Sequence, residues 1–100
     1  MAFELIFQPE AKEQLRDLEF HPDRQDLVRL RKVRKCLGLL EESPKHPSLR
    51  THEFRSLQGL NGEKVWEAYV ENNVSAAWRV FWHYGPGKGV ITIIAITQHP

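Results

Sequence analysis

Residues 64–97, KVWEAYVENNVSAAWRVFWHYGPGKGVITIIAIT, decide the fold of this 100-residue chain. Apolar and polar side chains alternate over 64–71, aromatic residues crowd 76–84 and β-branched residues fill 90–97, patterns typical of β-strands. The turn sequences between these segments are only a few residues long. Such short connections join antiparallel neighbours, because a parallel pair needs a crossover of about a dozen residues or more. We therefore predict a three-stranded antiparallel meander.

Outward from this meander, the first half of the chain predicts a strand and two helices. Residues 3–7, FELIF, show the two-residue period of a short strand. Pro9 suits the first turn of a helix, which we expect to end at the His21-Pro22 pair. Asp23 is a good N-cap for a second, amphipathic helix that Pro44 stops.

The strand pattern also predicts the order of the sheet. Residues 90–97 are apolar on both faces, as in an interior strand, whereas Glu67 and Glu71 suit an edge strand. The N-terminal strand is then expected beside the last one. We predict one α+β domain over residues 1–100, with a four-stranded sheet, two antiparallel helices on one face, and the other face free for function.

Composition excludes several classes of function. With 14 Lys and Arg against 13 Asp and Glu, the net charge of +1 gives no general attraction to nucleic acid or membranes. A single cysteine, Cys36, excludes an internal disulfide and a thiolate zinc site, and His46 and His52 show no metal-ligand spacing. No segment is apolar enough to span a membrane. We expect no metal, no cofactor, no membrane association and a cytoplasmic location.

A basic cluster in residues 49–55, LRTHEFR, is a candidate RNA-binding segment. If the segment is extended, Arg50 and His52 lie on one side and Arg55 on the other. Arginine can donate two hydrogen bonds to a phosphate, and an imidazole can move a proton at neutral pH. The alternative is an irregular surface loop whose charges pair with Glu53 and solvent.

Three residues near the last two strands are candidates for catalysis. Alternation places Arg79 and His83 on one face of the strand 76–84. A buried arginine needs an anionic partner, so Arg79 is structural if it pairs with Glu67 and can stabilise a phosphorane-like transition state if it faces the open side. His99 follows the last strand, where it can act as a general acid or base, or can simply be exposed.

The order strand, helix, helix, meander resembles the RelE/ParE toxin superfamily over essentially the whole chain. The resemblance extends to particular segments: HPSLRTHEFRSLQG (46–59), VWEAYV (65–70), WRVFW (78–82) and ITIIAITQHP (91–100). Its most specific points are the Leu57-Gln58-Gly59 step, the Trp66-Glu67 pair and the Arg79-Val80 step. The superfamily resemblance implies the toxin of a type II toxin–antitoxin system, neutralised by an antitoxin protein.

In the RelE and YoeB branches, the resemblance implies cleavage of messenger RNA on the ribosome, by metal-independent attack of the ribose 2′-hydroxyl on the adjacent phosphate. Arg79 matches the sheet arginine that stabilises phosphate charge, and His99 matches the C-terminal histidine of the YoeB-like branch. Arg55 lies near the basic, substrate-gripping segment. His83 has no family counterpart and is nominated by the face that it shares with Arg79.

The chain also departs from the pattern of the RelE-like toxins. It carries Glu67, Tyr69 and Glu71 where those toxins place lysines, and Pro100 where a basic or aromatic residue usually follows the histidine. Two alternatives therefore stay open beside the endoribonuclease: a ParE-like module that blocks a topoisomerase, and a member without activity that only binds a partner. The sequence leaves the oligomeric state open.

Overall fold

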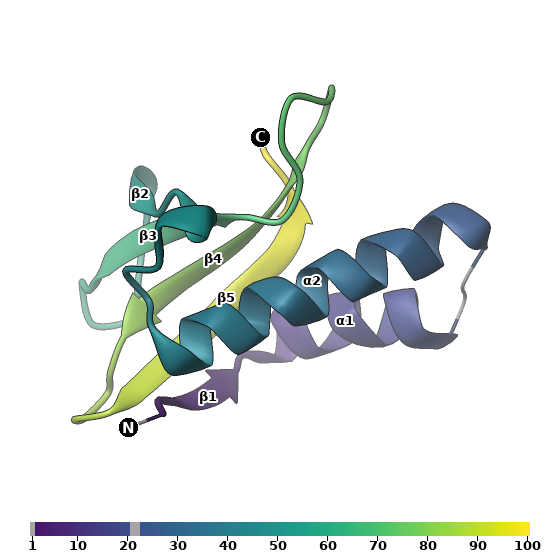
Figure 1. Cartoon of the computed structure of the whole chain (residues 1–100). Helices are drawn as coiled ribbons and strands as arrows, with labels where there is room; N and C mark the ends of the chain where they lie inside the picture. Colours follow the sequence, from purple (N-terminus) through teal and green to yellow (C-terminus); the bar gives the residue numbers. More distant parts are fainter. Residues whose placement is uncertain (1, 21–22) are drawn as a thin grey trace.

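The computed structural model describes residues 2–20 and 23–100, and Figure 1 shows the order of the elements along the chain. Two helices follow a short first strand, and four further strands follow the helices. The elements are β1 (Glu4–Phe7), α1 (Pro9–Phe20), α2 (Arg24–Glu42), the 3-10 turn η1 (Pro47–Leu49), β2 (His52–Gln58), β3 (Lys64–Tyr69), β4 (Trp78–Tyr84) and β5 (Val90–Gln98).

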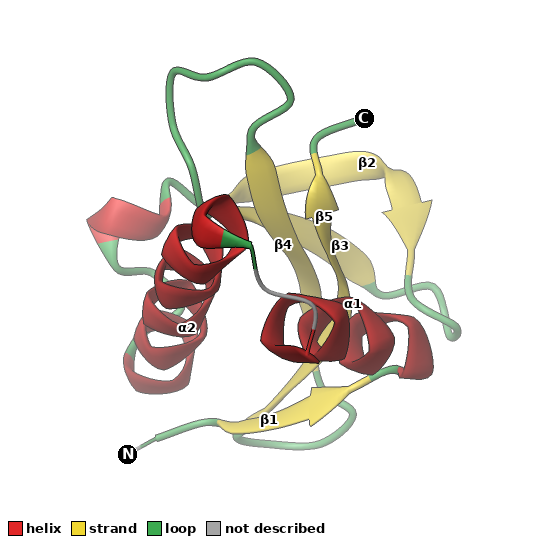
Figure 2. Ribbon diagram, turned by 90° about the vertical axis from the view of Figure 1, so that its right-hand side faces the viewer, coloured by secondary structure: helices red, strands yellow, loops and turns green. Residues whose placement is uncertain are grey.

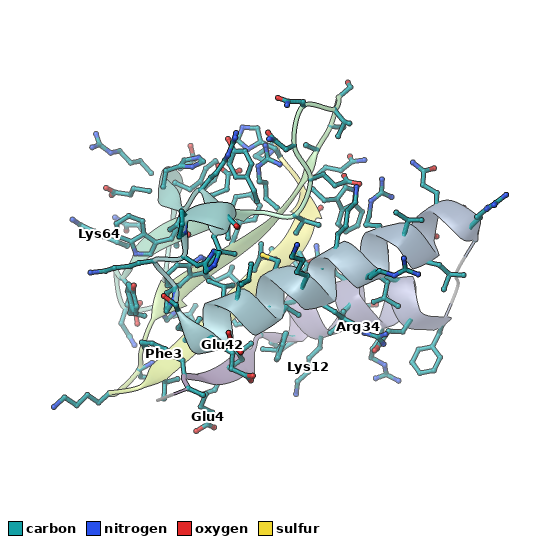
Figure 3. All side chains as sticks on the ribbon, in the orientation of Figure 1. Phe3, Glu4, Lys12, Arg34, Glu42 and Lys64 are labelled. Carbon is teal, nitrogen blue, oxygen red and sulfur yellow. The ribbon has the colours of Figure 1, made fainter. Side chains whose placement is uncertain are left out.

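The helices begin where the sequence predicts. Pro9 is the first residue of α1, and the carboxylate of Asp23 accepts a hydrogen bond of 2.8 Å from the amide of Asp26 at the start of α2. The predicted end of the first helix at the His21-Pro22 pair lies outside the described residues. Charged side chains such as Lys12 and Arg34 project from the outer surfaces of the helices (Figure 3). Neither described helix is long and apolar enough to cross a membrane.

The predicted meander and the place of the first strand are confirmed. Strands β3, β4 and β5 pair in antiparallel succession, and β1 runs parallel to β5 with Glu4 opposite Val90. The full sheet order is β1-β5-β4-β3-β2.

The sheet has five strands rather than the four predicted, and β3 is an interior strand rather than an edge. The extra strand is β2, which pairs with β3 through His52 opposite Glu67 and Glu53 opposite Trp66, and after an irregular stretch through Gln58 opposite Lys64. Most of its residues are exposed, so β2 carries little of the alternation that marks a half-buried strand. The glutamate on β3 that suggested an edge lies instead opposite a histidine.

Both helices lie over one face of the sheet, and the main core fills the space between them (Figure 2). The pairing of β4 with β5 contains a bulge. Phe81 lies opposite Ala95, but the next residue, Trp82, lies opposite Ile93, so one residue of β5 has no partner. The extra residue, Ile94, shifts the alternation, so β5 supplies apolar side chains to both faces. The helices and the sheet both contribute buried side chains to this core, among them Ala11, Leu18, Leu30, Val33, Leu37, Leu40, Ala68, Val80, Trp82, Ile91, Ile93 and Ile96.

The opposite face carries a small apolar cluster beside buried polar groups. Val65, Phe81 and Ala95 form this cluster, packed against Phe54 and Ile94. Four polar or charged residues in the described part of the chain are also buried: Glu67, Arg79, His83 and Thr92. Charges are costly to bury unless they are paired, so this face is where a functional site is to be sought.

Candidate functional site

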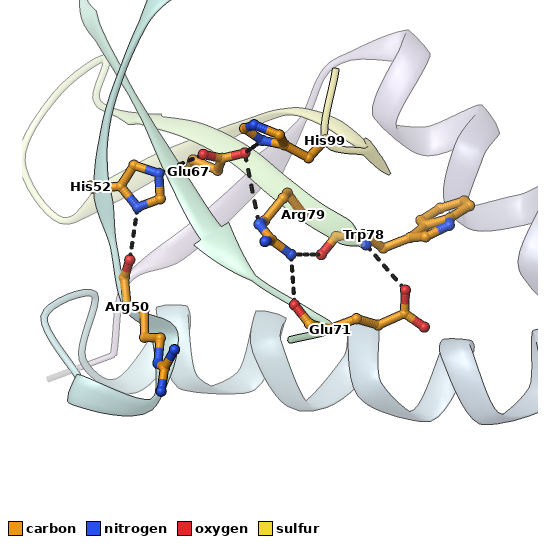
Figure 4. Close-up of polar contacts among 7 residues, drawn as sticks. All are labelled: Arg50, His52, Glu67, Glu71, Trp78, Arg79 and His99. Carbon is orange, nitrogen blue, oxygen red and sulfur yellow. Dashed lines mark hydrogen bonds and ion pairs between the residues drawn. The ribbon is translucent and has the colours of Figure 1, made fainter. Parts of the chain in front are cut away.

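A buried carboxylate between two imidazoles forms the centre of the candidate site (Figure 4). Glu67 on β3 is fully buried, and its Oε1 lies 2.6 Å from His52 Nε2. Its Oε2 forms a short hydrogen bond with Nδ1 of His99. The β2–β3 register brings His52 opposite Glu67, and a 2.8 Å hydrogen bond from the His99 amide to the carbonyl of Ala77 fixes the chain just beyond β5.

The hydrogen bonds of His99 leave one ring nitrogen available. A carboxylate only accepts hydrogen bonds, so the Nδ1 of His99 that faces Glu67 carries the proton. In the neutral ring Nε2 then holds a lone pair, and it bonds to no described residue. The side chain is 46% exposed, so a ligand can reach it. A carboxylate that fixes the tautomer of a neighbouring imidazole in this way is a recurrent arrangement in acid–base catalysis.

His52 faces acceptors on both sides of its ring. Nδ1 lies 3.0 Å from the carbonyl oxygen of Arg50, and Nε2 faces the carboxylate of Glu67. The contact with Glu67 is a close approach rather than a hydrogen bond, since Glu67 Oε1 has no hydrogen-bond partner among the described residues. The His52 side chain is 47% exposed, so it borders the site at the surface.

Arg79 is held inside the sheet rather than open to solvent. Only 8% of the residue is exposed, and its Nη1 donates to the carbonyls of Glu71 at 2.6 Å and Trp78 at 3.0 Å. Its Nε lies 3.8 Å from Glu67 Oε2, and the guanidinium carbon lies 3.7 Å from the centre of the Tyr69 ring. This is the paired arrangement in which Arg79 was expected to be structural. Arg79 therefore offsets and fixes the charge of Glu67.

The three side chains around the carboxylate do not form a metal centre. Within residues 2–20 and 23–100, no group of three or more His, Cys, Asp or Glu side chains is arranged to hold a metal ion. The imidazole nitrogens of His52 and His99 already lie at hydrogen-bond distance from the oxygens of Glu67. What this arrangement can do is move a proton at His99, beside the exposed ring of His52.

The two predicted RNA-binding arginines lie differently with respect to the cluster. Arg50 adopts a left-handed backbone conformation with φ 47°, its Nη1 lies 3.4 Å from Asn72 Oδ1, and its guanidinium lies 5.8 Å from the centre of the Tyr69 ring. It thus borders the site directly. Arg55 projects from the edge strand with 87% of its side chain exposed, at 3.8 Å from Glu53.

The structure does not bring His83 to this cluster. It lies on the same face of β4 as Arg79 but toward the other end of the strand, opposite Thr92. The residue is 3% exposed, and its Nδ1 lies 2.8 Å from the carbonyl oxygen of Tyr84. It also lines a small cavity together with Asn61.

Glu67 was not predicted as the centre of the site. The sequence indicated it only as a possible partner of Arg79 and as an acidic residue where RelE-like toxins place lysines. The missing information was the pairing of β2 with β3, which sets His52 against Glu67. A glutamate and a histidine in neighbouring extended segments were the available signal, but the spacing of the two residues along the chain does not fix a register.

Comparisons with known proteins identify the fold. No family model and no curated protein sequence matches the chain. A YoeB/ParE toxin from Agrobacterium tumefaciens superposes with a TM-score of 0.67 at 15% identity, over 97% of this chain and 99% of that chain. The RelE–RelB complex from the archaeon Pyrococcus horikoshii gives 0.64 at 14% identity, over 98% of this chain and 96% of that chain. The DinJ–YafQ toxin–antitoxin complex of E. coli gives 0.64 at 13% identity, over 99% and 94%. The chain therefore has the RelE/ParE toxin fold, as the sequence resemblance predicted.

Proposed function

We propose that the chain is the toxin of a type II toxin–antitoxin system and that it cleaves messenger RNA on the ribosome without a metal ion. One observation carries this proposal: a half-exposed His99, oriented through Nδ1 by the buried Glu67, with its Nε2 bonded to no described residue. The fold supports the same class, because the similar structures are toxins, some of them solved with an antitoxin.

The proposed reaction uses the RNA itself as nucleophile. Nε2 of His99 takes the proton of a ribose 2′-hydroxyl, and the 2′-oxygen forms a bond to the adjacent phosphorus. The bond from phosphorus to the 5′-oxygen of the next nucleotide breaks, which leaves a 2′,3′-cyclic phosphate and a 5′-hydroxyl. The leaving oxygen takes a proton from the surrounding water, because both ring nitrogens of His52 already face protein oxygens, and His99 then releases its proton to water.

The remaining residues of the cluster position these two imidazoles and attract the phosphate. Glu67 fixes the tautomer of His99, and Arg79, whose Nε lies 3.8 Å from Glu67 Oε2, holds the Glu67 side chain in place. Arg50 and Arg55 supply the positive charge that holds the RNA backbone near the edge of the sheet. The guanidinium of Arg79 is enclosed, so it gives little support to the prediction that Arg79 itself contacts the phosphate.

An antitoxin is the expected protein partner. RelE from P. horikoshii and YafQ from E. coli were each solved in complex with an antitoxin, and this chain shares their fold. We infer that a cognate antitoxin binds this chain and blocks its action in the cytoplasm, where translating ribosomes are found.

Cleavage of a defined message on programmed ribosomes tests the proposal. The purified wild-type protein should cut the message, and His99→Ala should slow cleavage by about 10²- to 10⁴-fold, the usual contribution of a general acid–base group. Lys12→Ala is the control, because it removes an exposed charge from α1 on the opposite side of the sheet (Figure 3). Cleavage that His99→Ala leaves at the wild-type rate would contradict the assignment.

Expression in growing cells separates the endoribonuclease from its alternatives. The proposal predicts growth arrest that His99→Ala relieves while the variant remains folded. A ParE-like topoisomerase inhibitor would instead cause arrest with a DNA-damage response, whether or not His99 is present. Normal growth of cells that contain folded wild-type protein would refute a toxin of either kind.

A further inference from the structure

A second cavity lies on the helix side of the sheet, where the loop around η1 meets β3 and β4. It has a volume of about 560 Å³, within the range of sites that take small organic ligands. Neither Glu67 nor His99 lines it, so it is distinct from the imidazole cluster. Arg50 is shared, because it lines the cavity while its carbonyl oxygen contacts His52.

The floor of this cavity is aromatic. Trp66 lies opposite Trp82 across the β3–β4 pairing, with the ring centres 6.4 Å apart. The ring of Tyr84 meets that of Trp82 edge to face at 4.9 Å. All three residues line the cavity, and flat π-surfaces of this kind bind flat aromatic ligands such as nucleobases.

Trp82 also offers an unused hydrogen-bond donor. The residue is 1% exposed, and its indole Nε1 has no hydrogen-bond partner among the described residues. An indole N–H can only donate, and a buried donor without an acceptor costs free energy. The atom is closed to solvent, so the side chains above it must shift before an acceptor atom of a ligand in the cavity can satisfy it. Nucleobases carry ring nitrogens and carbonyl oxygens, whereas an aliphatic or phenyl side chain has no such atom.

The charges around the cavity favour an anion. Lys45, His46 and Arg50 line it, and no acidic residue does. Three other cavities of the described chain are lined by carboxylates: one by Glu13 and Asp17, one by Asp17 and Asp26, and one by Glu63. A base-binding floor with a basic rim matches a ligand that joins an aromatic ring to a phosphate.

We propose that this cavity binds one nucleotide unit, with the base against Trp66, Trp82 and Tyr84, an acceptor atom of the base on the Trp82 indole N–H, and the phosphate at Lys45 and Arg50. Either a free nucleotide or one nucleotide of an RNA strand offers this chemistry. The inference does not depend on RNA cleavage, since no residue of the Glu67–His99 pair takes part in it.

Titration of ¹⁵N-labelled protein with nucleotides tests the proposal through the indole N–H signals. The chain has three tryptophans, so Trp→Phe variants assign the three signals. Trp78 is the matched internal control, because its Nε1 also lacks a described partner but lines a different cavity. The probes are AMP, UMP, the corresponding nucleosides and a single-stranded RNA tetramer. We expect the Trp82 signal to move downfield with saturation while the Trp78 signal stays in place.

Two variants measure the contacts separately. Trp82→Phe keeps an aromatic ring and removes the N–H, and it should weaken nucleotide binding by about 3- to 10-fold, as the loss of one hydrogen bond does. Lys45 is exposed, so Lys45→Ala keeps the fold even if Trp82→Phe does not. It should weaken binding of AMP but not of adenosine. Trp78→Phe and Lys12→Ala should bind as the wild type does.

The outcomes distinguish the two ligand sources and can overturn the inference. Saturable shifts with mononucleotides indicate a free nucleotide, and shifts with the tetramer alone indicate an RNA strand. The inference fails if no probe moves the Trp82 signal at millimolar concentration. It also fails if Lys45→Ala leaves AMP binding unchanged, or if an aromatic amino-acid amide moves the signal more than any nucleotide. None of these results depends on whether the chain cleaves RNA.

Discussion

The two ends of β4 carry buried polar residues of different character on the same face of the sheet. Near one end, Arg79 packs on Tyr69 beside Glu67, which contacts two imidazoles that are each nearly half exposed. Near the other end, His83 is 3% exposed and contacts the backbone carbonyl of Tyr84. The first end is a network of charges open to a ligand, and the second is a single enclosed ring.

This difference comes from the neighbouring strands rather than from β4 itself. β2 adds His52 and the segment after β5 adds His99 at the Arg79 end, where Glu67 on β3 joins them. The two-residue period places Arg79 and His83 on one face but does not determine which of them is part of a network. The predictions below test this contrast between a charge network and an isolated buried ring.

The largest effect is expected for Glu67→Ala. The substitution leaves the buried Arg79 without its carboxylate, and breaking a buried ion pair from one side costs about 3–5 kcal/mol of the free energy of unfolding. Urea denaturation measures it. Glu42→Ala, on an exposed residue at the end of α2 (Figure 3), is the control and should change stability by less than about 0.5 kcal/mol. A small effect of Glu67→Ala would show that the charges are not coupled in the folded protein.

Alanine substitutions of His83 and His99, made one at a time, should separate an effect on stability from an effect on activity. His83→Ala removes a buried ring and its contact with the Tyr84 carbonyl, so it should lower the free energy of unfolding by about 1–3 kcal/mol. His99→Ala removes a half-exposed ring and should cost less than about 1 kcal/mol. Thermal melts of both variants, read beside the ribosome assay, give the comparison. A larger loss of stability with His99→Ala than with His83→Ala would reverse the contrast.

The helix cap at the start of α2 tests how far the charge network around Glu67 extends. Asp23→Ala removes the acceptor for the amide of Asp26 and should cost about 1 kcal/mol. Combined with Glu67→Ala, the two losses should add to within about 0.5 kcal/mol, because the sites share no partner. Double-variant denaturation curves measure this sum. A clear departure from additivity would mean that the ion pairs of Arg29 with Asp26 and Glu71 couple the start of α2 to the network.

The smallest effect concerns Tyr84, next to His83. Partial burial raises the pKa of the Tyr84 phenol above its ordinary value of 10.0. The unfolded chain therefore loses this proton first, so stability falls slightly as pH rises from about 10 through the folded pKa. A Tyr69→Phe variant leaves Tyr84 as the one tyrosine, and its absorbance near 295 nm should titrate above pH 10. A midpoint below 10 would contradict the burial.

Much of the fold follows from local sequence patterns. Residues 64–97 predicted the meander because β-branched and aromatic residues and short turns are local signals. The two apolar faces of 90–97 placed β1 beside β5, although the bulge at Ile94 produces part of that pattern. Asp23 predicted the start of α2 because a cap acts within three residues.

The fifth strand and the centre of the site could not be predicted from local sequence patterns. β2 is exposed and irregular, so its place depends on backbone pairing with β3 rather than on its own side chains. The Glu67 contacts depend on registers between segments that are distant in sequence, which no periodicity specifies. Arg79 and His99 were found because an arginine inside a strand and a histidine after one are unusual in themselves.

The parallel pairing of β1 with β5 joins two strands that lie far apart in the sequence, with Glu4 opposite Val90. During translation β1 leaves the exit tunnel before β5 does. It therefore stays unpaired until β5 has also left the tunnel. His99 meets Glu67 only after that moment. On the proposed function, the imidazole cluster is therefore complete only once the sheet has formed across both of its halves, β1 with β5 and β2 with β3.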